Sequence, residues 1–383
     1  MKIVIAVEEF DPDKGYLEYY LAKELTKLGH KVWVLTFGWG KHILRTRFVE
    51  GFEVIRIPPI ATWNGLHIPC FNAIIYIVKF IKKERPDVIH CQPLFSPLSL
   101  IFIWSQRLSK HRIVGSLITG EYSISSTIAN LKYEATKIVI EHYVENKADS
   151  IFAVNDGWKK ILLELFDLAE QKISLVPLGV DIEIFKFDAQ TRISMRDRLH
   201  LFPDNIVVVY SGKITSSKKL HLLVKAIAPI MMRNQKVKLL IVGDGESSYL
   251  EHLKELCSNL KVSNNVIFHP SVHRTKLAEF YSASDVAVWP GSVSISIIEA
   301  ASVGLPVIIK RTPITKFEIE YDNGFAFEPE NVIELNSYLE KLVTNHELRK
   351  DMGRKSRLLV EQKLNWQAIA RQYLDAYRKS TVG

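Results

Sequence analysis

Two lysines flank a turn between a strand and a helix in the stretch YSGKITSSKKL. Lys213 comes just after an apolar strand that ends at Gly212, and Lys218 comes five residues later, where a helical pattern begins. Side-chain cations at such a place can bind one anion together with the backbone N–H groups of the helix N-terminus. A solvated surface loop is the alternative, since lysine is usually exposed. The spacing of glycine and lysine excludes a Walker A loop.

A pair of glycines follows the next apolar strand, in LIVGDGESSYL. Gly243 and Gly245 predict a tight turn whose backbone can come close to a ligand, because glycine has no Cβ. A dinucleotide-binding fingerprint needs a third glycine, and Ser248 stands in that place. An NAD-dependent oxidoreductase is therefore disfavoured.

A third stretch, WPGSVSISIIEAASVGLPV, leads from a strand end through small uncharged residues into a helix with a single acid, Glu299. Ser296 and Glu299 have the spacing of a capping box, which is a structural explanation for the acid. The backbone N–H groups of Val293, Ser294 and Ile295 are suited to bind a phosphate at the positive helix end. The spacing leaves both interpretations open, and they are compatible if a ligand hydroxyl reaches Glu299.

Histidines end two further predicted strands, His90 in DVIH and His269 in VIFH. Ligands of open parallel sheets bind at the carboxyl ends of the strands, so either side chain could contact a ligand. The alternative for each is a structural histidine whose hydrogen bonds are satisfied inside the fold.

These stretches belong to an alternation of strands and helices that runs along the whole chain. Continuous apolar strands between helices predict parallel sheets covered on both faces. The alternation breaks over 177–204, a polar and turn-rich segment that we interpret as a connection. Because 383 residues exceed a single core, we expect an α/β fold with two doubly wound, Rossmann-like domains and a ligand cleft between them. We place these domains at 1–185 and 186–365, with a helix in 366–383 that packs back on the N-terminal domain.

The composition narrows the classes of partner and compartment. A net charge of +8 favours anionic partners such as nucleotides or a lipid surface. No run of basic residues interleaved with aromatics occurs, so nucleic acid is not expected. The three cysteines lie far apart, and neither a disulfide framework nor a metal site is expected. There is no signal-peptide pattern and no apolar run long enough to span a bilayer, so we expect a cytoplasmic protein.

The predicted helix over 74–85 is mostly apolar and carries Lys79, Lys82, Lys83 and Arg85 near its end. In a helix that packs on the sheet, cations at this end are favoured by the helix dipole. The alternative is a surface that rests on anionic lipid, at the inner face of the cell membrane.

Taken together, the motifs resemble glycosyltransferase family 4, retaining enzymes of the GT-B fold. The resemblance runs in the family's order from GYLEYYLAKELTKLGHKV through PDVIHCQ, SLVPLGVDIEIF, YSGKITSSKKL, LIVGDGE and IIEAASVGLPVI to LNWQAIARQYLDAY. It implies transfer of a sugar from a nucleotide-diphosphate sugar, UDP- or GDP-linked, to a glycan or a lipid-linked acceptor. It also implies that neither a metal nor a further cofactor takes part.

The resemblance implies roles for particular residues. Lys213 and Lys218 would bind the donor diphosphate, and Glu299 would bind the ribose hydroxyls. Backbone at the turns and strand ends would contact the phosphates and the base, at Gly15, Gly212, Gly243, Gly245, Pro270, Val272, Val293, Ser294 and Ile295. On the acceptor side the candidates are His90, Thr119 and Glu121.

The chain departs from the family pattern at several places. The first acid of a glutamate pair is expected eight residues before Glu299, where this chain has Gly291. Thr119 replaces a histidine, and Tyr16 stands where a second loop glycine is expected. Two alternatives therefore stay open, namely a catalytically silent nucleotide-sugar binder and a sugar-nucleotide epimerase or hydrolase of the same fold. In the predicted transfer, cations and N–H groups stabilise the charge that the diphosphate gains as the glycosidic bond breaks.

Overall fold

The computed structural model describes residues 1–12, 17–38, 42–48, 50–63, 66–94, 96–116, 147–165, 168–291, 294–312 and 319–379. The chain divides into two compact units, which we call the N-unit (Met1–Leu178 with Trp366–Gly383) and the C-unit (Gly179–Asn365). The sequence placed the first boundary at 185 and the second at 365. Among the described residues, no helix combines the length and the apolar character that crossing a bilayer requires.

The N-unit is built on an eight-stranded sheet with the order β10-β9-β8-β7-β1-β2-β4-β3. Neighbouring strands are parallel except β3 and β4, which are antiparallel. The strands are β1 (Lys2–Val7), β2 (Lys31–Phe37), β3 (Leu44–Arg47), β4 (Glu53–Ile57), β7 (Val88–Gln92), β8 (Arg112–Gly115), β9 (Ser150–Ala153) and β10 (Ile173–Leu175). A separate hairpin joins β5 (Pro59–Trp63) to β6 (Leu66–Pro69).

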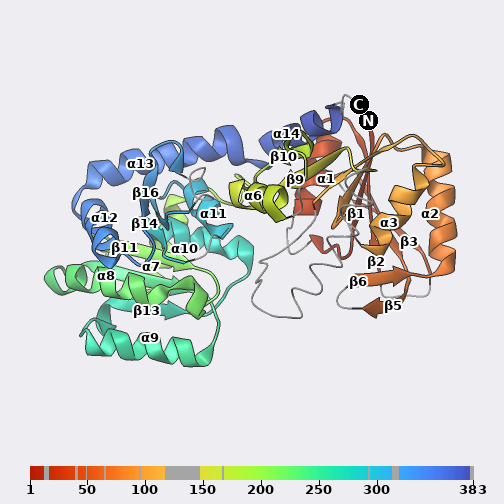
Figure 1. The fold of residues 1–383 in the computed structure, drawn as a ribbon. Coiled ribbons are helices and arrows are strands. Elements are labelled where there is room, and N and C mark those ends of the chain that lie inside the picture. The colour runs from red at the N-terminus through yellow and green to blue at the C-terminus, as the bar shows by residue number, and fades with distance from the viewer. Residues whose placement is uncertain are drawn as a thin grey trace. The chain divides into compact units, whose positions relative to one another are not determined.

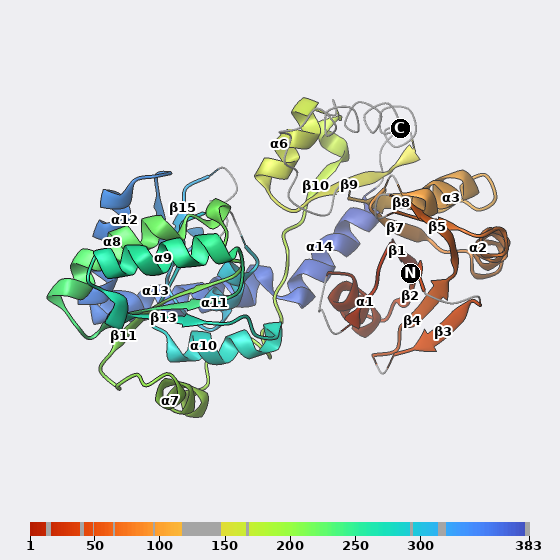
Figure 2. The same ribbon diagram turned by 90° about the horizontal axis from the view of Figure 1, so that it is seen from below.

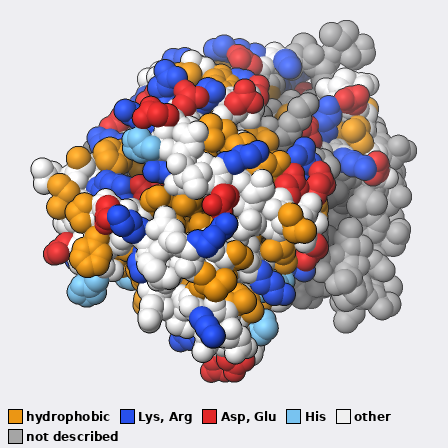
Figure 3. All heavy atoms as spheres, turned by 90° about the vertical axis from the view of Figure 1, so that its left-hand side faces the viewer, with side chains coloured by type: hydrophobic (Ala, Val, Ile, Leu, Met, Phe, Trp, Pro, Cys, Tyr) orange, Lys and Arg blue, Asp and Glu red, His pale blue; other side chains and the backbone are white. Residues whose placement is uncertain are grey.

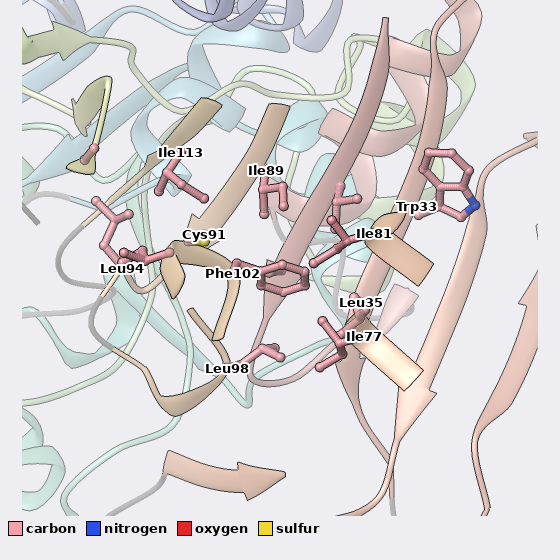
Figure 4. Close-up of a cluster of buried hydrophobic side chains, with 14 of the residues drawn as sticks. Trp33, Leu35, Ile77, Ile81, Ile89, Cys91, Leu94, Leu98, Phe102 and Ile113 are labelled. Atoms are coloured by element: carbon pink, nitrogen blue, oxygen red, sulfur yellow. The ribbon is translucent and has the colours of Figure 1, made fainter. Parts of the chain in front are cut away.

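Helices cover both faces of this sheet, as its continuous apolar strands require (Figures 1 and 2). On one face lie α1 (Leu17–Lys27) and α14 (Trp366–Arg378), and the Trp366 ring stacks on Tyr20 with 5.1 Å between centroids. On the other lie α2 (Phe71–Glu84) and α3 (Pro97–Ser105). Figure 4 shows their apolar side chains, Ile77 and Phe102 among them, against Ile89 of β7. The N-unit also contains α6 (Asp156–Leu165).

The C-unit has a six-stranded, fully parallel sheet with the order β13-β12-β11-β14-β15-β16. Its strands are β11 (Ile206–Ser211), β12 (Val237–Val242), β13 (Val266–His269), β14 (Val286–Trp289), β15 (Val307–Lys310) and β16 (Gly324–Phe327). Its helices are α7 (Ala189–Arg198), α8 (Leu220–Arg233), α9 (Ser247–Asn259), α10 (Leu277–Ala283), α11 (Ser296–Ser302), α12 (Val332–Thr344) and α13 (His346–Leu359). In Figure 2, α8 and α9 lie on one side of this sheet and α10 and α11 on the other. The predicted α/β class with two doubly wound parallel sheets is confirmed.

One helix of the C-unit was not expected. The segment 177–204 was interpreted as a connection, yet α7 lies inside it. Asp188 caps its N-terminus by accepting a hydrogen bond from the Thr191 N–H at 2.6 Å. Arg192 and Arg196 then bind Asp285, at 2.6 and 2.8 Å. Asp285 lies 89 positions beyond Arg196, so no local pattern indicated this pairing, and the polar sequence was interpreted as a connection.

Candidate functional site

The predicted donor residues gather at the carboxyl ends of β11, β12 and β14, which are adjacent strands of the C-unit. The loops after β11 and β12 are joined by backbone hydrogen bonds. The Gly212 N–H donates to the Val242 carbonyl at 3.0 Å, and the Ile214 N–H donates to the Asp244 carbonyl at 2.9 Å. We call these two hydrogen-bonded loops, which follow β11 and β12, the ledge of the C-unit.

The glycines of this ledge allow the two loops to touch. A Cβ added at Gly243 would lie 1.9 Å from the Gly212 carbonyl oxygen, and one at Gly245 would lie 2.0 Å from the Ile214 carbonyl oxygen. No side chain fits at such distances. The sequence assigned these glycines to the approach of a ligand, whereas the structure shows that they serve first the approach of one loop to another.

Both lysines lie in the loop between β11 and α8. Lys213 is exposed, and its carbonyl accepts a hydrogen bond of 2.8 Å from the buried Tyr210 hydroxyl. Lys218 is half-buried and ends a short 3₁₀ helix (Ser216–Lys218). The helix α8 begins after Lys219, which has a φ of 55° in the left-handed region. Both lysines thus lie in the strand-to-helix loop that the sequence indicated, and their binding of a common anion stays a prediction.

Glu299 does not form the predicted capping box. Ile295 occupies the N-cap of α11 without a side-chain cap, and Ser296 is already inside the helix. The Glu299 carboxylate instead accepts a hydrogen bond of 2.5 Å from Arg274 Nε, and its side chain is only 1% exposed. Burial raises the pKa of Glu299, and the Arg274 guanidinium opposes part of that rise.

Arg274 is the residue that sequence reasoning missed. It lies in a 3₁₀ turn (Arg274–Lys276) ahead of α10, 25 positions before its partner, and no local spacing connects the two. A buried charge needs a partner of opposite sign, so a lone acid in an apolar helix was the available signal. The pair places a fixed cation beside the acid predicted to bind the ribose.

A buried hydrogen-bonded cluster lies at the end of β11, where these loops begin. The Ser211 and Tyr281 hydroxyls are 2.6 Å apart, and Trp289 Nε1 donates to the Ser211 carbonyl at 3.0 Å. All three side chains are buried. Burial raises the pKa of Tyr281 well above its ordinary value, so this hydroxyl stays protonated.

The remaining predicted donor contacts lie at neighbouring positions. After β13, Pro270 is exposed and Val272 half-buried, and the Ser271 N–H between them donates to Asp244 at 3.1 Å. His269 at the end of β13 has Nδ1 2.8 Å from the Pro270 carbonyl oxygen. Ser294, before α11, accepts a hydrogen bond at Oγ from the Ser296 N–H at 3.3 Å. Ile295, the N-cap residue of α11, is half-buried. Four predicted residues fall outside the described ranges: Gly15, Thr119, Glu121 and Val293.

His90 is not an acceptor contact in this structure, which corrects one prediction. It is the third residue of β7 rather than its end, and it is 1% exposed. Its Nδ1 lies 2.7 Å from the Tyr377 hydroxyl of α14, and burial lowers its pKa to about 3. His90 is therefore a structural histidine inside the fold, which was the alternative interpretation of the sequence. Its partner lies 287 positions away, so no sequence spacing could indicate it.

Two family models match the chain. Residues 192–373 match the model described as glycosyl transferases group 1, and residues 18–184 match that of glycosyltransferase family 4. An uncharacterized glycosyltransferase of Methanocaldococcus jannaschii is 23% identical over 395 residues, which are 99% of this chain and 98% of that protein. The alpha-monoglucosyldiacylglycerol synthase of Streptococcus pneumoniae is 24% identical over 304 residues, 76% of this chain and 66% of its own length.

Solved structures share the fold over the whole chain. A glycosyltransferase of Rickettsia africae superposes with a TM-score of 0.76 at 18% identity, covering 98% of this chain and 97% of its own. HepE of Anabaena, solved in complex with UDP, has a TM-score of 0.74 at 16% identity, with 98% and 99% covered.

Proposed function

The chain belongs to the glycosyltransferases, with the GT-B fold, and from this premise we propose that it transfers a sugar from a nucleotide-diphosphate sugar to a glycan or lipid-linked acceptor. The observation that carries the proposal is the ledge of the C-unit. Its loop after β11 carries Lys213 and Lys218, and at the same carboxyl edge of the sheet the Arg274–Glu299 pair joins the segment after β13 to α11, which follows β14.

The chemistry follows from the charge of the leaving group. When the glycosidic bond breaks, the departing diphosphate gains negative charge, and prepositioned cations and N–H donors lower that barrier. In the proposed mode Lys213 and Lys218 bind the diphosphate, while the N–H groups of Ser294 and Ile295 support it. No metal takes part in this scheme, and the sugar is transferred with retention of configuration.

Glu299 would hold the nucleoside. Its pairing with Arg274 favours the ionised carboxylate in a buried place, which then accepts hydrogen bonds from the ribose hydroxyls. A nucleoside diphosphate fits a site that joins this carboxylate to two lysines. UDP- and GDP-linked sugars are the proposed donors, and the complexes of Anabaena HepE with UDP and with UDP-glucose support the first.

A lipid-linked acceptor is supported by the Streptococcus relative, whose name, alpha-monoglucosyldiacylglycerol synthase, is that of an enzyme that makes a glycosylated diacylglycerol. The second support is a face of the N-unit. The helix α3 is apolar on all sides, as a buried helix is, yet Trp104 is 50% exposed. None of the exposed residues of α2 and α3 is acidic, and they include Phe71, Ile75, Lys79, Lys82, Lys83, Leu100 and Trp104.

We call these seven residues the α2–α3 face and propose that it rests on an anionic bilayer. Exposed aromatic and aliphatic side chains enter the interface, and lysines bind anionic headgroups. The face of the C-unit helices in Figure 3 is different, because Lys and Arg side chains are interspersed there with Asp and Glu.

A ligand panel tests the proposed donor. Binding of UDP- or GDP-sugars raises the unfolding temperature by mass action, and Lys213→Ala and Lys218→Ala reduce that rise. Lys254→Ala, which removes an exposed lysine of α9, is the matched control and leaves the rise unchanged. Binding without transfer to any acceptor would indicate the silent binder, and steady consumption of donor without acceptor would indicate the epimerase or hydrolase.

A further inference from the structure

Gly291 lies against the backbone of the loop that carries Lys218. It is buried, two residues after the end of β14. A Cβ added there would lie 2.5 Å from the Lys218 Cα and carbonyl carbon, and 2.5 Å from the Ser217 carbonyl oxygen. These are backbone atoms, which cannot turn aside as the end of a flexible side chain can. No residue other than glycine fits without moving the Lys218 loop.

The same loop is held in an unfavourable conformation. Lys219 has a φ of 55°, which costs a residue with a Cβ about 1 kcal/mol. Its Nζ is paired with Glu330 Oε1 at 3.3 Å, and its N–H donates to the Ser216 carbonyl at 3.1 Å. Such conformations persist where the surroundings enforce them, and they are frequent at ligand sites.

We propose that Gly291 is a positioning residue that sets the place of Lys218 against the donor diphosphate. This inference rests on the proposed function. The resemblance leads one to expect an acid at this position, but here the loop backbone fills the space of any side chain. With glycine in place of the expected acid, no carboxylate lies beside the loop. A carboxylate there would attract the Lys218 ammonium and compete with the diphosphate.

Substitution at Gly291 tests the proposal. Gly291→Ala pushes the loop aside, and displacement of a catalytic group by about 1 Å can cost about 10²-fold in rate. Gly291→Glu restores the expected acid and lowers kcat/KM at least as far. A higher rate in Gly291→Glu than in the wild type would overturn the proposal.

A double-mutant cycle shows whether Gly291 acts through Lys218. If it does, Lys218→Ala with Gly291→Ala is no slower than Lys218→Ala alone. Gly353→Ala of α13 is the matched control, since its Cβ would lie 2.2 Å from the Gly304 carbonyl oxygen. Its effect on the rate multiplies with that of Lys218→Ala. If the effect of Gly291→Ala on the rate also multiplies with that of Lys218→Ala, the positioning role is contradicted.

If Gly291→Ala does not fold, a second variant tests whether the Lys218 loop must be held in place, as the proposal requires. Glu330→Gln removes the exposed pair that holds Lys219 and leaves Gly291 untouched. It lowers the rate several-fold in the wild type and has no effect beside Lys218→Ala, and equal effects in both backgrounds contradict the proposal. Failure of the proposed function is distinguishable, because the wild type would then show no stabilisation by UDP- or GDP-sugars.

Discussion

In the C-unit the loops after β11 and β12 are bonded to each other, and the loop after β14 packs against the Lys218 backbone. At the carboxyl edge of the N-unit sheet, three buried polar atoms lack hydrogen-bond partners among the described residues. They are Glu8 Oε1 after β1, Gln92 Oε1 at the end of β7 and Ser116 Oγ after β8. These three strands are adjacent, and Val7 is paired with Gln92 in the sheet register.

The difference concerns what each unit can bind without rearrangement. An unsatisfied buried polar group costs about 1–3 kcal/mol, and a ligand that supplies the missing partner recovers that cost. In the C-unit the loop that carries Lys213 and Lys218 is fixed by packing, which suits the proposed donor site. Among the described residues, the N-unit edge has two carbonyl-type oxygens and one hydroxyl without partners, and such groups suit the hydroxyl-rich glycosyl acceptor that we propose.

The largest expected effect is on the C-unit cations. Lys213→Ala and Lys218→Ala each lower kcat by about 10²–10³, because the leaving diphosphate loses a prepositioned charge. Steady-state kinetics with a saturating donor measures this loss, and unchanged thermal unfolding shows that the fold survives. Rates near those of the wild type in both variants would mean that the ledge is not the donor site.

Breaking the buried ion pair of the C-unit comes next. Arg274→Ala leaves the Glu299 carboxylate buried without its cation and lowers the free energy of unfolding by about 3 kcal/mol. Chemical denaturation measures it. Combining Arg274→Met with Glu299→Leu restores most of the stability but not donor binding, since the ribose contact is gone. Normal donor affinity in that double variant would show that the Arg274–Glu299 pair is not part of the donor site.

The α2–α3 face gives an effect of similar size on membrane binding. Neutralising Lys82 and Lys83 to Gln weakens binding to vesicles that contain anionic lipid by about 1 kcal/mol per charge. Sedimentation with anionic and with neutral vesicles measures it, and Lys254→Gln of the C-unit is the control. Binding that is insensitive to both substitutions would show that this face does not rest on lipid.

Below the N-unit edge His90 is buried and hydrogen-bonded to Tyr377, and this assignment is testable by pH. Its pKa falls from an ordinary value near 6.5 to about 3 in the fold, so the unfolded chain takes up a proton first. The stability due to neutral His90 is complete above pH 6.5 and is lost as the pH falls toward 3. His90→Phe removes this loss, about 2 kcal/mol between pH 7 and pH 4.5. Unfolding by denaturant at both pH values checks it, and equal losses in variant and wild type would contradict the assignment.

The smallest expected effect concerns Glu8 at the N-unit edge. Its Oε2 accepts a hydrogen bond of 2.9 Å from the His67 N–H, while Oε1 is buried without a partner in the described part of the chain. Glu8→Gln is expected to raise the KM for the acceptor about tenfold, since a charged hydrogen bond becomes neutral. The donor affinity stays unchanged. If only the donor affinity changed, the proposal that the N-unit binds the acceptor and the C-unit the donor would be contradicted.

Local patterns were sufficient for the central strands of both sheets and for the class of fold. The continuous apolar strands and the helices between them predicted two parallel sheets, because these patterns depend on neighbouring residues only. The glycines at 243 and 245 and the lysines at 213 and 218 were also found in this way. Each of them lies in a loop that follows a strand, and the sequence itself indicates that loop.

Contacts between distant segments were not predictable. Arg196 of α7 binds Asp285, Glu299 binds Arg274 instead of capping its helix, and His90 binds Tyr377. In each case the buried polar group needs a partner, and the sequence indicates that need without indicating which residue meets it. The same holds for the space at Gly291, because only the packing of this residue, two positions after β14, against the Lys218 loop shows that no Cβ fits. Sequence by itself determined which residues could do chemistry, and tertiary packing decided which of them are held where they can.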